Sequence, residues 1–224
     1  MTLAEALAAL DAHIEPGRGA QMAAYHKQSR KVLGVSNPAL NDLTRDWRQT
    51  LTLPERIRLA DALWQTDIFE ARIAAAKLLT QARIKEDEPV WLLIASWVAD
   101  FDSWAIADHA CSAGERRLIA TPARIDTVEG WTRSSHMWTR RAALVITLPW
   151  TKQNHPTSID LAIRDRVLGW AATLADDQDW FIQKAIAWWL RELSKHDAPR
   201  TQAWLSTHGT RLKAFARKEA GKYL

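Results

Sequence analysis

Residues Asp179 to Lys195 read DWFIQKAIAWWLRELSK and give the clearest indication of the fold in this chain. At helical spacing it carries an apolar stripe, which predicts a helix packed against a core. The residues of this stripe are Ile182, Ile186, Trp189 and Leu193. A second face alternates aromatic rings with fixed positive charges, and consists of Trp180, Lys184, Trp188, Arg191 and Lys195. Such a face suits a polyanion with stackable bases. It is equally typical of an amphipathic helix whose lysine stems cover a wide tryptophan core, so both interpretations stay open.

Helical periodicity recurs along the rest of the chain, and signals for strands are nearly absent. No Asn-Gly or Asp-Gly hairpin occurs, and no run alternates β-branched with polar residues. Apolar spacing, capping residues and prolines predict helices over residues 3–10, 20–31, 54–64, 69–81, 90–99 and 104–111. Further helices are expected to begin near Ser36, Pro122, Ser134, Ser158, Asp179 and Pro199. The segment Trp150–Ser158 is the best candidate for a longer exposed loop.

The fold class predicted from this pattern is all-α. Five prolines (Pro54, Pro89, Pro122, Pro156 and Pro199) are spaced 35, 33, 34 and 43 residues apart, which is the scale of a repeated helix pair. We therefore expect an α-solenoid, a superhelix of HEAT-like pairs with a concave basic groove. An irregular helical bundle is the alternative. No linker separates two compositions, so residues 1–224 are expected to form a single domain.

The composition is that of a soluble globular protein, and its charge is unevenly distributed. The formal net charge is +4, yet residues 181–224 alone sum to +6. A basic C-terminal end permits nucleic acid as a partner. One cysteine excludes an internal disulfide framework, and the longest apolar run, residues 90–99, is about half a membrane span. The N-terminus is a poor signal peptide, so we expect a cytoplasmic protein without membrane contact.

Two short motifs could carry chemistry. Trp104 and Asp108 are four residues apart on an expected helix, so an indole and a carboxylate share one face. This pair suits a cationic centre, but it also fits a capped helix with one core Trp and one solvated Asp. Arg140 and Arg141 are adjacent at a helix start and could contact phosphate or solvent. Metal-ligand spacings and glycine-rich nucleotide loops are absent, so neither a metal nor a cofactor is expected.

Three segments together resemble one family: WAIAD at Trp104–Asp108, MWTRRAA at Met137–Ala143 and FIQKAIAWWLRE at Phe181–Glu192. Two more segments, AAYHKQSRKVLGVSNPALNDL near the start and FARKEAGKYL at the end, are similar as well. The family is the AlkD-like group of DNA alkylation repair proteins, which are helical-repeat DNA glycosylases. The resemblance covers nearly the whole chain in order, and FIQKAIxWxLRE is its most specific part.

The resemblance implies roles for individual residues. Asp108 would be the catalytic carboxylate, with Trp104 as its aromatic neighbour. Trp188 would be the second ring at the lesion, and Arg141 would contact a backbone phosphate. Tyr25 falls where the family has a tyrosine. The other candidates for DNA contacts are Arg140, Lys184, Arg191 and Lys195. The chain departs from the family at Ala105, where an acidic residue is common, and at Ala187, where glycine is common.

The activity that the resemblance implies is excision of N3- and N7-alkylated purines from duplex DNA, without a pocket that receives the base. The partner would be double-stranded DNA with alkylated purines, and the protein would act as a monomer, associated with the nucleoid while it is on DNA. Two alternatives remain from the sequence. One is a non-catalytic helical-repeat protein that binds distorted or branched DNA. The other is a protein-interaction scaffold with no nucleic-acid partner.

Overall fold

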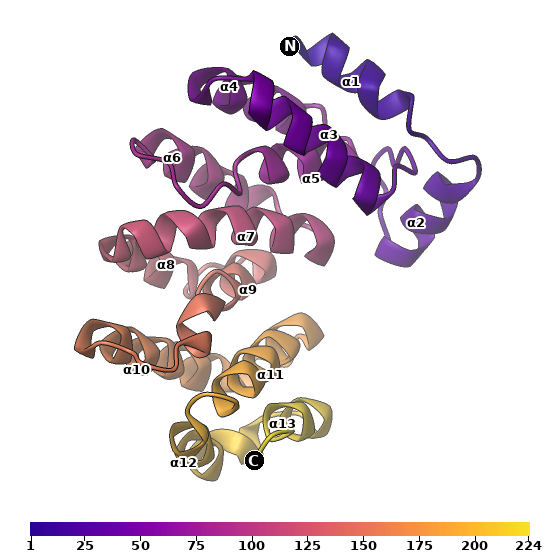
Figure 1. The fold of residues 1–224 in the computed structure, drawn as a ribbon. Helices are drawn as coiled ribbons and strands as arrows, with labels where there is room; N and C mark the ends of the chain where they lie inside the picture. The colour runs from indigo at the N-terminus through magenta and orange to yellow at the C-terminus, as the bar shows by residue number, and fades with distance from the viewer. The chain divides into compact units, whose positions relative to one another are not determined.

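The protein is all-helical, as the sequence predicted. A computed structural model describes all 224 residues, and its ribbon is built from helices joined by short connections (Figure 1). It contains thirteen α-helices, five short 3₁₀ helices and a single isolated β-bridge between Ile14 and Val35. The chain divides into two compact units, Met1–Arg117 and Leu118–Leu224. The solenoid, its concave groove and the single domain over residues 1–224 stay predictions, because each unit is described by itself. No helix is both long enough and apolar enough to cross a membrane.

The first unit is built around a short alanine-rich helix, α5. Its helices are α1 (Leu3–Asp11), α2 (Arg18–His26), α3 (Asn37–Thr50), α4 (Leu53–Gln65), α5 (Phe69–Leu78), α6 (Glu88–Trp97) and most of α7 (Trp104–Ala120). Every residue of α5 except Lys77 is buried, and the helix packs against α3 and α4. Three consecutive alanines in α5 allow its neighbours to approach closely. Beside it, Trp64 and Trp97 stack with ring centroids 4.3 Å apart and planes at 5°.

The second unit is built around α11. Its helices are α8 (Ile125–Trp131), α9 (Met137–Val145), α10 (Ser158–Thr173), α11 (Trp180–Ser194), α12 (Ala198–His208) and α13 (Ala214–Ala220). Helix α11 packs against α9, α12 and α13 (Figure 1). Its apolar stripe is fully buried, which confirms the prediction; the members of the stripe are Ile182, Ile186, Trp189 and Leu193. Trp189 is the core indole, and its Nε1 donates to Thr147 Oγ1 at 3.2 Å.

Helix α2 ends five residues earlier than predicted. Lys27 adopts a left-handed conformation with φ of 53°, and the N–H of Gln28 donates to the Ala23 carbonyl at 2.9 Å. The N–H of Lys27 donates to Ala24 in the same turn, which completes a Schellman motif. Glycine usually occupies the left-handed position of this motif. A lysine there gives no sequence signal, and for that reason the prediction of a helix to residue 31 is wrong.

The predicted exposed loop Trp150–Ser158 is correct only in its second half. Residues Leu148–Lys152 form a 3₁₀ helix in which Trp150 is 2% exposed and Thr151 is fully buried. Arg164 of α10 holds this segment: its Nε donates to the Trp150 carbonyl at 2.7 Å and its Nη2 donates to the Gln153 carbonyl at 2.7 Å. Arg164 thus satisfies the carbonyl groups of an irregular segment from a later helix. Such a tertiary contact cannot be predicted from the local sequence.

Candidate functional site

In the first unit, α7 carries both members of the predicted indole–carboxylate pair. Trp104 is the first residue of α7 and Asp108 follows one turn later, so both side chains lie on one face. Both are half-buried. The predicted Tyr25 is brought to the same place by α2, because its ring lies edge-on to the Trp104 indole with centroids 6.3 Å apart. Tyr25 is 73% exposed, so its ring is a surface feature.

His26 is a member of this group that the sequence did not indicate. Its imidazole lies 5.0 Å from the Trp104 ring and 4.9 Å from the Phe69 ring, and it meets Tyr25 edge-on at 4.8 Å. Burial lowers the pKa of His26, and the Glu70 carboxylate offsets part of this shift. The imidazole is therefore neutral at pH 7. In the sequence, only the position of His26 next to Tyr25 could have indicated this contact. Apolar periodicity does not detect a histidine that packs against aromatic rings.

Glu70 fixes the segment that follows α2. This carboxylate is fully buried and accepts from the backbone N–H groups of Leu33 at 2.8 Å, Gly34 at 2.7 Å and Val35 at 3.3 Å. Gly34 has φ of +92°, and a Cβ there would lie 2.5 Å from the backbone nitrogen of Gly19. The α2–α3 connection is thus clamped onto α5 beside Phe69, which in turn contacts His26.

In the second unit, Arg141 and Trp188 lie on α9 and α11. Arg141 is 4% exposed, and its guanidinium lies over the Trp138 ring at 5.6 Å. Trp138 contacts Phe181 with ring centroids 4.6 Å apart. Trp188 is half-buried, in contrast to the fully buried Trp189 beside it. Trp104 and Asp108 belong to one unit, whereas Arg141 and Trp188 belong to the other, so the grouping of these four side chains at one lesion stays a prediction.

The other face of α11 is accessible and aromatic, as predicted. Trp180 is 46% exposed and the Lys184 ammonium lies 4.6 Å from the centroid of its ring. Trp180 also stacks on Phe215 of α13, with centroids 5.9 Å apart and planes at 27°. Phe215 is 38% exposed and was not singled out from the sequence. Together Trp180, Lys184 and Phe215 form a surface of two rings and one ammonium.

The remaining predicted DNA-binding cations have carboxylate partners within the protein. Arg140 donates through Nε and Nη2 to Asp177, and its Nη1 donates to two backbone carbonyls before α9. Arg191 pairs with Glu192 and Glu219. Lys195 pairs with Glu192 at 2.9 Å and lies over the Tyr223 ring. Lys184, in contrast to Arg140, Arg191 and Lys195, has no carboxylate partner, so its charge is the least compensated of these four.

The two departures from the family pattern are buried. Ala105 is 7% exposed and Ala187 is fully buried. Neither position therefore contributes much side-chain surface next to Trp104 or Trp188.

Gln183, the glutamine of the FIQKAI motif, has a structural function. It is fully buried; its Nε2 donates to the carbonyls of Ala175 at 2.9 Å and Asp177 at 2.8 Å, and its Oε1 accepts from the N–H of Lys213 at 2.9 Å. It thus ties the connection before α11 to the start of α13.

Replacing Gln183 with Leu is expected to lower the free energy of unfolding by about 2–4 kcal/mol, because three backbone groups lose their partner at nearly constant side-chain volume. Urea titration of both proteins measures this difference. The exposed Gln202 of α12 provides the control, since Gln202→Leu is expected to change stability by less than about 0.5 kcal/mol. A Gln183→Leu protein as stable as the wild type would contradict this interpretation of the motif.

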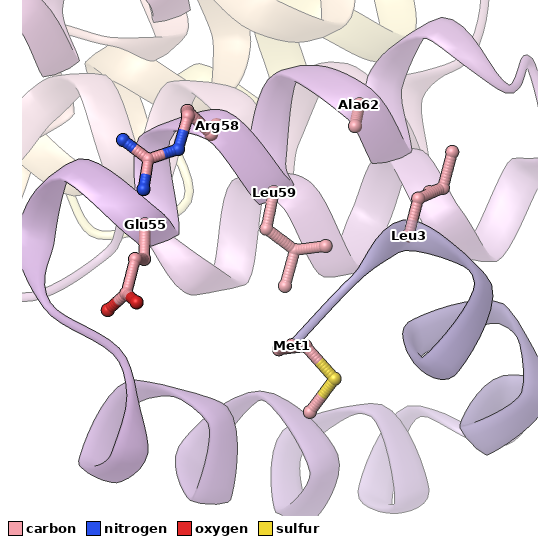
Figure 2. A pocket seen from close by; sticks show the side chains of 6 residues that line it. All are labelled: Met1, Leu3, Glu55, Arg58, Leu59 and Ala62. Atoms are coloured by element: carbon pink, nitrogen blue, oxygen red, sulfur yellow. The ribbon is translucent and has the colours of Figure 1, made fainter.

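A separate cavity of about 270 Å³ lies between the N-terminal segment and α4 in the first unit. Figure 2 shows its lining, namely Met1, Leu3, Glu55, Arg58, Leu59 and Ala62. Glu55 is the capping carboxylate of α4, and hydrogen bonds from the side chain and backbone of Thr52 lower its pKa. The cavity is therefore lined by a helix-capping carboxylate, one arginine and apolar side chains, and it does not include any predicted site residue. No group of three or more His, Cys, Asp or Glu side chains is arranged to hold a metal ion.

The protein is all-helical, and Trp104 and Asp108 share one face of α7. On α9 and α11, Trp138 lies beside Arg141 and Trp180 lies beside Lys184. The chain belongs to the family of DNA alkylation repair enzymes, whose model matches residues 6–224. Membership supports a role in the repair of alkylation damage, with DNA as the substrate.

Solved structures with a similar fold come from the same group of proteins. A predicted DNA alkylation repair enzyme from Enterococcus faecalis is 21% identical, with a TM-score of 0.77, and the match covers 94% of this chain and 96% of that one. AlkD2 from Streptococcus mutans is 19% identical, with a TM-score of 0.63 and coverage of 92% and 98%. At these identities the likeness shows the fold. No match was found among curated proteins.

Proposed function

We propose that this protein is a monofunctional DNA glycosylase that releases N3- and N7-alkylated purines from duplex DNA. The observation that carries the proposal is the pair on α7: Trp104 and Asp108 share one face, and Tyr25 and His26 pack against the Trp104 indole. The chain belongs to the DNA alkylation repair family, and the sequence resemblance implies that these two residues lie at the lesion.

The chemistry of the lesion explains why a carboxylate is sufficient. Alkylation at N3 or N7 places positive charge on the purine, so the N-glycosidic bond breaks with its electron pair moving to the purine nitrogen. The neutral alkylpurine leaves without an acid catalyst, and positive charge develops on the sugar. The negative charge of the Asp108 carboxylate stabilises this positive charge. Water then bonds to C1′, Asp108 accepts its proton, and an abasic site remains.

The aromatic side chains at the start of α7 are proposed to strengthen this electrostatic effect. Tyr25 and His26 contact the Trp104 indole, and this indole is proposed to exclude bulk water from one side of the Asp108 carboxylate. A neutral His26 suits this position, because an imidazolium would compete with the cationic sugar for the carboxylate. Charge interactions are stronger where water is excluded. The enzyme would then select cationic lesions because their N-glycosidic bond breaks easily, and it would not require a pocket for the base.

The second unit is proposed to bind the DNA around the lesion. Trp188 is half-buried and is proposed to contact the lesion nucleotide with the accessible part of its ring. Arg141, whose guanidinium lies over the Trp138 ring, is proposed to contact a backbone phosphate. Trp180, Lys184 and Phe215 offer exposed rings beside an uncompensated ammonium, a combination that suits nucleic acid.

Incubation of excess protein with duplex DNA that contains a single N7-methylguanine tests the proposal. Free N7-methylguanine and an equal amount of abasic DNA are expected, and undamaged duplex should stay intact. If the protein retains the duplex with salt-dependent affinity but forms no abasic product, the non-catalytic DNA-binding alternative replaces the glycosylase. Failure to retain any DNA at low ionic strength would favour a protein-interaction scaffold.

A further inference from the structure

The first unit contains a group of basic side chains that none of the roles above uses. Arg48 of α3 donates through Nη1 to the Lys77 carbonyl at 2.6 Å, and Lys77 of α5 donates through Nζ to Asn41 Oδ1 at 2.5 Å. Arg56 of α4 donates through Nη1 to Gln81 Oε1 at 2.6 Å. All three acceptors are uncharged. Three cations from three helices are therefore held together without a carboxylate partner.

Other buried arginines in this unit are arranged differently. Arg72 pairs with Asp67 at 3.0 Å, and Arg30, whose side chain is 8% exposed, pairs with Asp67 and Asp102. Carboxylates are also available on α3, but Asp42 and Asp46 are both paired with Arg45. The excess of positive charge is thus a local property of the group around Lys77.

The cations in this group repel one another and are partly removed from water. Burial lowers the pKa of Lys77, and the neighbouring Arg48 lowers it further. The pKa of Arg48 is lowered by burial and by Arg56 and Arg45. On α7, burial and the charge of Lys77 lower the pKa of His109 to about 4, so this imidazole is neutral at pH 7. An anion bound here would offset the repulsion between these cations and would favour their charged forms.

We propose that Arg48, Lys77 and His109 form a site for a backbone phosphate of duplex DNA. Each side chain is half-buried and thus keeps access to solvent, whereas Arg56 is 8% exposed and adds positive charge near Arg48. A guanidinium, an ammonium and an imidazole N–H can share the oxygens of one phosphodiester. His109 directly follows Asp108, so a phosphate at this site would fix the strand next to the candidate catalytic carboxylate.

The assignment of DNA as the ligand rests on the proposed function, but the phosphate site does not require excision. Undamaged duplex is therefore the probe, and Lys77→Gln is the test variant. Because mutual repulsion is removed, we expect the Tm of the free variant to equal or exceed that of the wild type. Its affinity for duplex should fall about tenfold at low salt. The slope of log K against log salt should decrease in magnitude by about 1.

A matched variant separates this site from a general loss of charge. Lys152 is exposed in the second unit, and Lys152→Gln removes the same charge; it should leave the salt slope unchanged. If Lys77→Gln lowers Tm and keeps the wild-type slope, the group is structural and the proposal is wrong. Normal duplex binding by wild type without alkylpurine release would instead overturn the glycosylase and leave the phosphate site intact.

Titration of the His109 imidazole in the wild-type protein by NMR provides a second readout that needs no variant at Lys77. Binding of undamaged duplex is expected to raise its pKa above about 4, because a phosphate favours the imidazolium. Inorganic phosphate at the same phosphate concentration should cause a smaller rise, since a duplex presents its phosphates through many contacts at once. An equal rise with inorganic phosphate would identify a small-anion site and overturn the backbone assignment. No rise with either ligand would overturn the site.

Discussion

Replacing Asp108 with Asn is expected to lower the single-turnover rate of N7-methylguanine release by about 10²- to 10³-fold. The amide keeps the size and shape of the side chain but removes the negative charge that meets the developing positive charge on the sugar. Binding of undamaged duplex should change little, because a carboxylate does not attract phosphates. The rate is measured with protein in excess over a duplex that carries one lesion, so product release does not limit it.

A charge-matched control uses Asp11, an exposed carboxylate on α1. Asp11→Asn removes the same charge from the same unit and should retain the wild-type rate. Equal release by wild type and Asp108→Asn would exclude Asp108 from the mechanism. A loss of release accompanied by a lower Tm would indicate a folding defect, and for this reason thermal unfolding of both variants accompanies the kinetics.

Replacing Glu70 with Ala is expected to lower the free energy of unfolding by about 3–6 kcal/mol. Three buried backbone N–H groups, those of Leu33, Gly34 and Val35, would lose a charged acceptor, and each such loss costs about 1–3 kcal/mol. Urea titration monitored by circular dichroism measures the difference. Glu70→Gln should lose less, because the amide oxygen still accepts from part of this backbone.

Glu86→Ala is the control for Glu70, since Glu86 is exposed in the connection before α6 and should change stability by less than about 0.5 kcal/mol. Because Glu70 clamps the segment after α2, its loss should also loosen His26 and Tyr25 at Trp104. A change below about 1 kcal/mol for Glu70→Ala would mean that water or another group replaces the carboxylate, contrary to this account.

The sequence predicted those parts of the fold that depend on local chemistry. Ser36 and Asp179 cap α3 and α11 as expected, since a short polar side chain before an apolar period satisfies free N–H groups. The buried stripe of α11 follows from helical spacing alone. Lys27 was missed as a helix end because a lysine in the left-handed region depends on its surroundings, and no residue-type preference reveals it.

The candidate site was predicted only in part, for a related reason. Motif resemblance singled out Trp104 and Asp108, and the structure adds His26 as a ring against Trp104. The clamp by Glu70 on residues 33–35 joins segments more than thirty positions apart. Buried charges usually require compensation, but the sequence does not tell which carboxylate is buried or what compensates it.

The group around Lys77 illustrates the same limit. Arg48, Lys77 and His109 come from α3, α5 and α7, and no spacing within one helix joins them. Their common property, positive charge without a nearby carboxylate, exists only after the three helices pack. The charge asymmetry visible in the sequence pointed to residues 181–224 instead, where Arg191 and Lys195 are compensated by acids.

The proposed mechanism requires that the Asp108 carboxylate stabilises positive charge on the sugar of the lesion nucleotide. Its most direct test compares the affinity for two duplexes, one with a cationic pyrrolidine and one with a neutral tetrahydrofuran at the lesion position. A charged mimic of the transition state should bind wild type at least about tenfold more tightly than the neutral ring. Asp108→Asn should bind both rings equally. If wild type also shows no preference, or if Asp108→Asn keeps the preference, Asp108 does not act on the sugar and the account is contradicted.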